Sequence, residues 1–401
     1  MPIEQAPPPW SRRAGGLAGA LVTLLAVAGA AKAQGAPRLH VAMAGPAQTV
    51  FASNRDPCGA NDAPDVNARA VRDARGNVVM FALHDVNRAL RGPDLDHLKI
   101  DCSVAYRGHG DPDPAHYDDH SWIAALWTKD GETVSALVHH EYHANEHPGR
   151  CVTSNAMACW YNTIIEIASH DGARSFAKPK EPVVAAAPFR QSFDQTRHRG
   201  FFNPSNIVSW RGKAYFFAST TGWSGQPYGA CLFASARPAD PRSWRAFDGR
   251  AFSVHYEDPY AYGFRAPTPC APIAPFGDPV GSIVRYRPSG AFLAVWQAKE
   301  GAGPYPLSGF YTASSRDLLH WSSPRLLMPG DTLYDDPCRS GGRLINYPSL
   351  LDPSARTRTF QDVGAHPWLY YVAMKADGCS IASNRVLLRR PLLVSTERGR
   401  R

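Results

Sequence analysis

The chain has 401 residues, with 43 Lys and Arg against 35 Asp and Glu, which gives a formal net charge of +8 at pH 7. A chain of this length can bury a sizeable core as one or two domains. The excess positive charge is spread thinly and forms no basic run before the extreme C-terminus, so nucleic acid is not expected as a partner.

The N-terminal residues have the pattern of a cleavable secretory signal. Two arginines precede an apolar run over residues 14–31, and a small-residue cleavage pattern ends at Ala33. We therefore expect a signal peptide over residues 1–33 and a single mature domain over residues 34–401, secreted or periplasmic. The two arginines leave export by the twin-arginine route open. No later apolar run approaches the length of a membrane span.

From Arg38 onward, short β-rich runs are bounded by Gly, Pro, Asp and Asn, and no long apolar run has a helical period. This pattern predicts an all-β protein. A polar turn before an apolar or aromatic anchor recurs along the chain with spacings of 77, 69, 77 and 68 residues. Its markers are Asp94, Asp171, Asp240, Asp317 and Arg385.

A proline that opens a strand-like run keeps the same step at Pro64, Pro204, Pro279 and Pro348, with the strand that begins at Trp122 filling the vacant second place. A fixed period with one sheet per repeat is typical of a propeller, because a lone four-stranded sheet cannot bury both of its faces. The sequence therefore predicts a five-bladed β-propeller with blade boundaries near residues 105, 185, 250 and 330. The apolar run 39–43 is expected to complete the fifth blade. A β-sandwich is the alternative fold.

A hairpin is the clearest local prediction. Two β-rich runs, 122–127 and 133–138, flank Asp130-Gly131, a pair that favours a tight turn with positive φ. If the second strand continues to residue 143, its two-residue period places His139, Glu141 and His143 on one face and His140 and Tyr142 on the other. A carboxylate among imidazoles at a strand end suggests a functional site.

All eight cysteines lie after the predicted signal peptide. An even number of cysteines in an oxidising compartment predicts four disulfides. Sequence alone does not determine the connectivity, and pairing neighbours along the chain gives Cys58–Cys102, Cys151–Cys159, Cys231–Cys270 and Cys338–Cys379.

Two segments carry a resemblance to known propellers. SHDGARSF at 169–176 looks like the Asp box of sialidases, from which Ala173, Ser175 and Phe176 depart. SSRDLLHW at 314–321, together with the proline-opened strands, resembles the five-bladed propellers of arabinanase, xylosidase and invertase-type glycosidases. The architecture of these enzymes matches essentially the whole predicted mature chain. The resemblance indicates membership of their superfamily, without selecting a single family, and implies a carbohydrate substrate.

The resembled enzymes place one Asp at the start of the first blade's inner strand, a second Asp on the next blade, and a Glu as the acid. Asp62 fits the first place as general base, Asp119 or its neighbour Asp118 fits the second, and Glu141 is the candidate acid, with a pKa raised by burial. The resemblance implies inversion, for which the Asp62 and Glu141 carboxyls are expected to lie about 6.5–9.5 Å apart. The resembled enzymes usually take the acid from blade three, whereas Glu141 would lie in blade two. Glu257 is therefore the substitute candidate for the acid if Glu141 does not have this role.

Other carboxylates, Asp65 among them, are interpreted as turn or cap residues. Sugars are held by amide, imidazole and guanidinium hydrogen bonds and by stacking on aromatic rings. The candidate substrate-binding residues at or near predicted strand ends are His84, Asn87, Arg88, His140, Tyr142, Trp160, Asn162, Asn206 and Asn346.

Residues 143–147 match the H-x-x-E-H zinc-protease string, but that motif works on a helix, and here a strand precedes it. The face of His139, Glu141 and His143 offers a metal site as an alternative.

The main prediction is a monomeric glycoside hydrolase without metal or cofactor. A carbohydrate-binding propeller without catalysis and a sialidase-like exo-glycosidase are the alternatives.

Overall fold

The computed structural model describes residues 38–397, so the predicted signal peptide lies outside the described residues. Within them the chain is all-β, as predicted. Its helical segments are short 3-10 turns: η1 (Pro114–His116), η2 (Ala144–Glu146), η3 (Ala156–Cys159) and η4 (Pro241–Ser243). Among these residues, no helix has the length and apolar character needed to cross a membrane.

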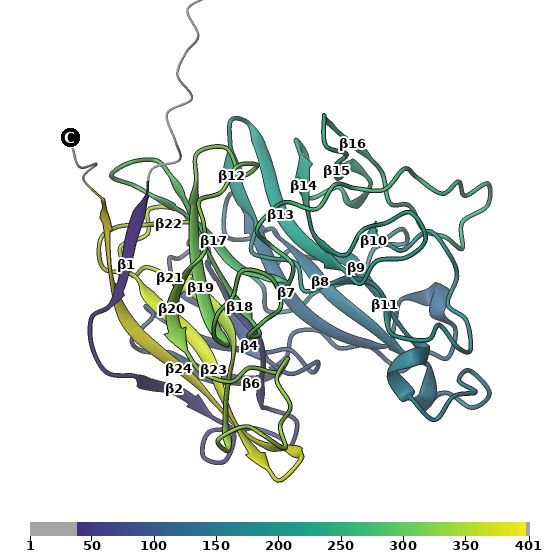
Figure 1. The fold of residues 1–401 in the computed structure, drawn as a ribbon, viewed down its shortest axis with the longest axis horizontal. Helices are drawn as coiled ribbons and strands as arrows, with labels where there is room; N and C mark the ends of the chain where they lie inside the picture. Colours follow the sequence, from purple (N-terminus) through teal and green to yellow (C-terminus); the bar gives the residue numbers. More distant parts are fainter. Residues whose placement is uncertain (1–37, 398–401) are drawn as a thin grey trace, which may run out of the picture. The chain divides into compact units, whose positions relative to one another are not determined.

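The strands follow one another as antiparallel groups in chain order (Figure 1). The first group pairs β3 (Pro64–Arg72), β4 (Val78–Leu83), β5 (Arg88–Gly92) and β6 (Lys99–Val104). The second group pairs β7 (His120–Thr128), β8 (Val134–His143), β9 (Trp160–Ser169) and β10 (Val183–Ala185). Within each of these two groups, strands that are consecutive in the chain pair with one another.

The third group contains β11 (Arg199–Phe202), β12 (Val208–Trp210), β13 (Lys213–Thr220), β14 (Gly229–Ser235), β15 (Arg245–Phe247) and β16 (Phe252–Val254). Because β11 also pairs in parallel with β9, the second and third groups share one ten-stranded sheet. The fourth group contains β17 (Val280–Tyr286), β18 (Phe292–Ala298), β19 (Gly309–Ser315) and β20 (Arg325–Pro329), with β22 (Asp362–Val363) parallel to β17.

The fifth group joins the two ends of the described chain. It contains β21 (Arg343–Leu351), β23 (Trp368–Asp377), β24 (Ser380–Thr396), β1 (Leu39–Met43) and β2 (Gln48–Ala52). The predicted pairing of the N-terminal strand with the last group is confirmed: β1 runs antiparallel to β24, with Leu39 opposite Thr396 (Figure 1). This pairing satisfies backbone groups that an open sheet edge would expose.

Hydrophobic clusters lie between consecutive groups, and one further cluster joins the fifth group to the first. Each sheet therefore buries apolar side chains on both faces, which a lone sheet in water could not do. In chain order the clusters contain Phe81 and Val138, Leu137 and Phe216, Phe217 and Trp296, Phe310 and Leu369, and Tyr370 and Met80.

Arg69 on β3 is a polar link between the groups. Its buried guanidinium donates hydrogen bonds to the carbonyl of Ala124 on β7, to the carbonyl of Pro204, and to the Ser349 hydroxyl on β21 at 2.8 Å. Burial lowers the pKa of Arg69 to about 9. Nearby, the Asn67 amide donates to the carbonyl of Pro348 at 2.9 Å. The strand β3 is thus tied to three other groups.

Four disulfides join the cysteines in the pairs that the sequence analysis gives, Cys58–Cys102, Cys151–Cys159, Cys231–Cys270 and Cys338–Cys379. The predicted pairing of neighbours is therefore confirmed. Four disulfides are typical of a protein in an extracellular or periplasmic compartment.

Candidate functional site

A cavity of about 780 Å³ is lined by residues of the first, second, third and fifth strand groups and by Pro279, which directly precedes β17 of the fourth group. Its polar lining is unusually rich in imidazoles and carboxylates, which come from strand ends far apart in the sequence. These lining residues are Asp65, His84, His120, His139, Glu141, His143, Glu146 and His198. Its aromatic lining is Trp122, Trp160, Phe202, Tyr228, Tyr334 and Tyr347.

The predicted hairpin is confirmed and supplies much of this lining. β7 and β8 pair antiparallel on either side of the Asp130-Gly131 turn, with His120 opposite Glu141. Gly131 has a φ of +83°, and a Cβ there would lie 2.4 Å from the backbone carbon of Asp73. Only glycine suits this turn, because both the backbone conformation and the close approach exclude a side chain.

The alternation of β8 places its residues as the sequence predicts. His139, Glu141 and His143 line the cavity. His140 and Tyr142 are buried on the opposite face, where the Tyr142 hydroxyl donates to the carbonyl of Pro112 at 2.8 Å.

Glu141 is surrounded by two imidazoles and a hydrogen-bonding amide. Its carboxylate lies 2.8 Å from Nε2 of His143 and 3.3 Å from Nε2 of His139, and it accepts a hydrogen bond from the Asn162 amide at 3.0 Å. Burial raises the pKa of Glu141, but the two imidazoles and the amide outweigh burial and lower it to about 2. The predicted rise in this pKa is therefore wrong, because the side chain faces histidines rather than apolar groups.

Asp65, interpreted from the sequence as a turn carboxylate, instead lines the cavity. Arg385 donates a hydrogen bond to it, Nε2 of His84 lies 3.3 Å away, and the Tyr347 hydroxyl donates at 3.4 Å. Burial raises the pKa of Asp65, against the opposing charges of Arg385 and His84. Its place directly after the strand-opening Pro64 was the signal that could have identified it.

Asp85 connects two further histidines of the cavity. Its carboxylate oxygens lie 2.6 Å from Nδ1 of His84 and 2.6 Å from Nδ1 of His120. Nε2 of His120 then lies 3.1 Å from Glu146, whose other oxygen lies 3.2 Å from Nδ1 of His143. Burial lowers the pKa of His120, but hydrogen bonds to Asp85 and Glu146 raise it to about 9.

Asp62 and Asp119, the other two predicted catalytic residues, are not among the residues that line this cavity. Asp62 is 1% exposed, and its carboxylate accepts hydrogen bonds from the backbone of Cys58 and Gly59 and from Arg88 at 2.7 Å. Asp119 is 3% exposed and lines a second cavity of about 380 Å³. Their catalytic roles stay predictions.

Asp119 holds the end of the hairpin. Its Oδ2 accepts a hydrogen bond from the backbone N–H of His143 at 2.9 Å and lies 3.0 Å from Nε2 of His147. The two substitute candidates lie nearer the surface: Asp118, the alternative to Asp119, lies 2.9 Å from Nδ1 of His109, and Glu257, the substitute for Glu141, lies 3.0 Å from Nδ1 of His255.

Two of the nine predicted substrate-binding residues, His84 and Trp160, line the cavity. The Trp160 ring stacks on His143 with ring centroids 3.7 Å apart. The other seven make contacts within the protein: Asn87, Arg88, His140, Tyr142, Asn162, Asn206 and Asn346. Asn87 and Asn206 each bond to backbone of the following strand group, at Ser121 and Ile283.

No protein-family model matches the sequence, and no curated protein matches it. Similar solved structures include glycoside hydrolases. A glycosyl hydrolase from Bacteroides ovatus has 14% identity and a TM-score of 0.44, with 82% of this chain and 84% of that chain covered. An N-acetylgalactosamine deacetylase from F. plautii, in complex with blood group B trisaccharide, has 13% identity and a TM-score of 0.45, with 89% and 95% covered.

A protein of unknown function from Dyadobacter fermentans DSM 18053 has 11% identity and a TM-score of 0.47, with 87% of this chain and 99% of that chain covered. Similarity at these values assigns neither an activity nor a substrate to this chain.

Proposed function

We propose that the five strand groups are the blades of a five-bladed β-propeller and that the chain is a secreted hydrolase that cleaves a glycosidic bond in its cavity. The propeller interpretation is supported by the cyclic order of the hydrophobic clusters, in which the last group packs against the first. The residues that bridge the groups, Arg69 above all, lie where inner strands of a propeller would meet.

The observation that carries the proposal is a pair of carboxyl groups, Asp65 from β3 and Glu141 from β8, that face one cavity from different groups. Glycoside hydrolysis uses two carboxyl groups that flank the scissile bond, one as acid and one as base or nucleophile. Asp65 replaces Asp62 in this pair, because the Asp62 carboxylate is directed into backbone and Arg88 contacts.

The remaining lining suits a sugar. Trp122 and Trp160 offer aromatic faces, and Asn203, Ser219 and Thr221 offer hydrogen-bonding groups. Sugar rings stack on aromatic faces while their hydroxyls take hydrogen bonds from such side chains. A cavity of about 780 Å³ lies within the usual range of small-molecule sites.

The test compares the parent protein with Asp65→Asn and Glu141→Gln on a panel of chromogenic glycosides and polysaccharides. Each variant should keep the fold and lose roughly 10² to 10⁴ in rate, the usual contribution of a positioned acid or base. Glu132→Gln, an exposed carboxylate at the far end of the same hairpin, is the control and should keep the parent rate.

Substrates with different leaving groups show which of Asp65 and Glu141 is the acid and which is the base or nucleophile. A dinitrophenyl leaving group needs little protonation, so the variant that lacks the acid should keep more rate on that glycoside than on an alkyl glycoside. Parent-level rates in both variants would refute the pair. Glycan binding without any released sugar would make the chain a carbohydrate-binding propeller.

A further inference from the structure

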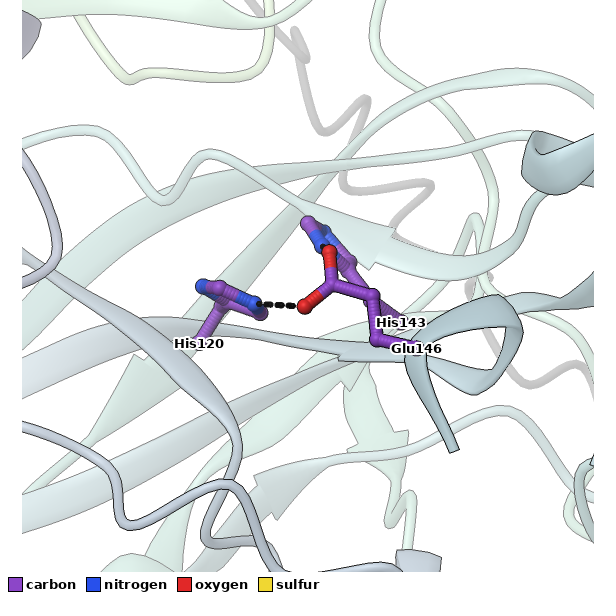
Figure 2. A group of neighbouring side chains, drawn as sticks. All are labelled: His120, His143 and Glu146. Atoms are coloured by element: carbon purple, nitrogen blue, oxygen red, sulfur yellow. Dashed lines mark hydrogen bonds and ion pairs between the residues drawn. The ribbon is translucent and has the colours of Figure 1, made fainter. Parts of the chain in front are cut away.

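Two imidazoles converge on one carboxylate at the wall of the cavity (Figure 2). His120 begins β7, His143 ends β8, and Glu146 lies in η2. Nε2 of His120 lies 3.1 Å from one oxygen of Glu146, and Nδ1 of His143 lies 3.2 Å from the other. The ligand atoms of the three side chains all lie within 4.8 Å of one another.

The second nitrogen of each ring is already held. Nδ1 of His120 lies 2.6 Å from Asp85, and Nε2 of His143 lies 2.8 Å from Glu141. An ionised carboxylate only accepts hydrogen bonds, so each ring donates there, and in the neutral imidazole the lone pair then points toward Glu146. When the imidazoles are neutral, one lone pair of each ring and the Glu146 carboxylate are therefore directed to the same place and are available to a cation.

We propose that His120, His143 and Glu146 bind one divalent transition-metal ion of the zinc class. Two imidazoles and one carboxylate are a donor set that suits Zn²⁺ and leaves a position open for water or a ligand. Ligand atoms about 2.0–2.1 Å from a tetrahedral ion lie about 3.3 Å apart, which the two observed contacts of 3.1 and 3.2 Å approach.

The carboxylates that contact the second nitrogen of each imidazole support this assignment. Histidines that bind metals generally donate their other N–H to a carboxylate or carbonyl, which fixes the orientation of the ring. Asp85 and Glu141 provide this contact for His120 and His143 respectively. The site is therefore distinct from the set of His139, Glu141 and His143 considered from the sequence, in which Glu141 would itself be a ligand.

The site also differs from the H-x-x-E-H arrangement of zinc proteases. His143 and Glu146 converge, but His147 turns away, stacks on Tyr142 with centroids 5.0 Å apart, and contacts Asp119. Access for an ion is open, because His120 and Glu146 line both the larger cavity and the second cavity of about 380 Å³. The site does not depend on the glycosidase proposal.

The experiment titrates ZnSO₄ into chelator-treated full-length mature protein by isothermal calorimetry, with MgCl₂ and CaCl₂ as comparison ions. The parent should bind one Zn²⁺ more tightly than either comparison ion. Glu146→Gln and His120→Asn should each weaken binding by more than about tenfold, and Asp85→Asn by roughly 10- to 100-fold. His198→Asn, a histidine of the same cavity outside the ligand set, should keep the parent Kd.

Glu146 is 51% exposed, so its substitution should leave the fold intact. As a measurement that needs no variant, Co²⁺ added to the parent should give the strong visible absorption of a four-coordinate site. No Zn²⁺ binding by the parent, equal Kd values for the parent and Glu146→Gln, or loss of binding in His198→Asn would overturn the proposal.

Discussion

Replacing Glu166 with Gln should remove a pH dependence of stability that this one carboxyl group creates. Glu166 on β9 is 3% exposed. One of its oxygens accepts a hydrogen bond from Ser135 at 2.8 Å, and the other accepts none from the residues that the structure describes. Burial raises the pKa of Glu166 from 4.5 to about 8, against the lowering by Ser135.

The folded protein thus holds the Glu166 proton more tightly than the unfolded chain does. The stabilisation is fully present below pH 4.5 and is lost as the pH rises through 8. Each pH unit between these values changes the unfolding free energy by roughly 1.4 kcal/mol. The contribution of this group should therefore fall by about 3–4 kcal/mol between about pH 5 and about pH 9.

Urea unfolding of the parent and of Glu166→Gln, followed by tryptophan fluorescence at several pH values with the disulfides intact, measures this contribution. All other titrating groups are common to the two proteins, so their difference isolates Glu166. The variant should gain stability relative to the parent as the pH rises, by about the amount given above. A difference that stays constant from acidic to alkaline pH would refute the reasoning.

Two other substitutions test the buried polar links. Asp62→Asn breaks a buried ion pair and should lower the unfolding free energy by about 3–5 kcal/mol in urea titrations; parent stability combined with lost activity would instead favour the catalytic role expected from the sequence. Arg69→Met leaves the carbonyls of Ala124 and Pro204 without their donor and should cost about 1–3 kcal/mol for each. A gain in thermal stability would contradict that interpretation.

The sequence alone determined the features that depend on residues close together in the chain. The hairpin follows from two β-rich runs and an Asp130-Gly131 turn, and the faces of β8 follow from the two-residue period of any strand. For the disulfides the sequence indicated only that all eight cysteines pair, and the pairing of neighbours was one choice among roughly 105 connectivities until the structure brought those cysteines together.

The composition of the cavity was decided only by the tertiary structure. Asp62 and Asp65 flank the same proline, and the packing of β3 places Asp65 in the cavity while Asp62 turns toward Arg88. His120 and Glu146 meet because two strand ends and a short turn converge. The pKa of Glu141 falls because histidines surround it in space. Such neighbours are set by the packing of whole sheets, which local sequence patterns do not encode.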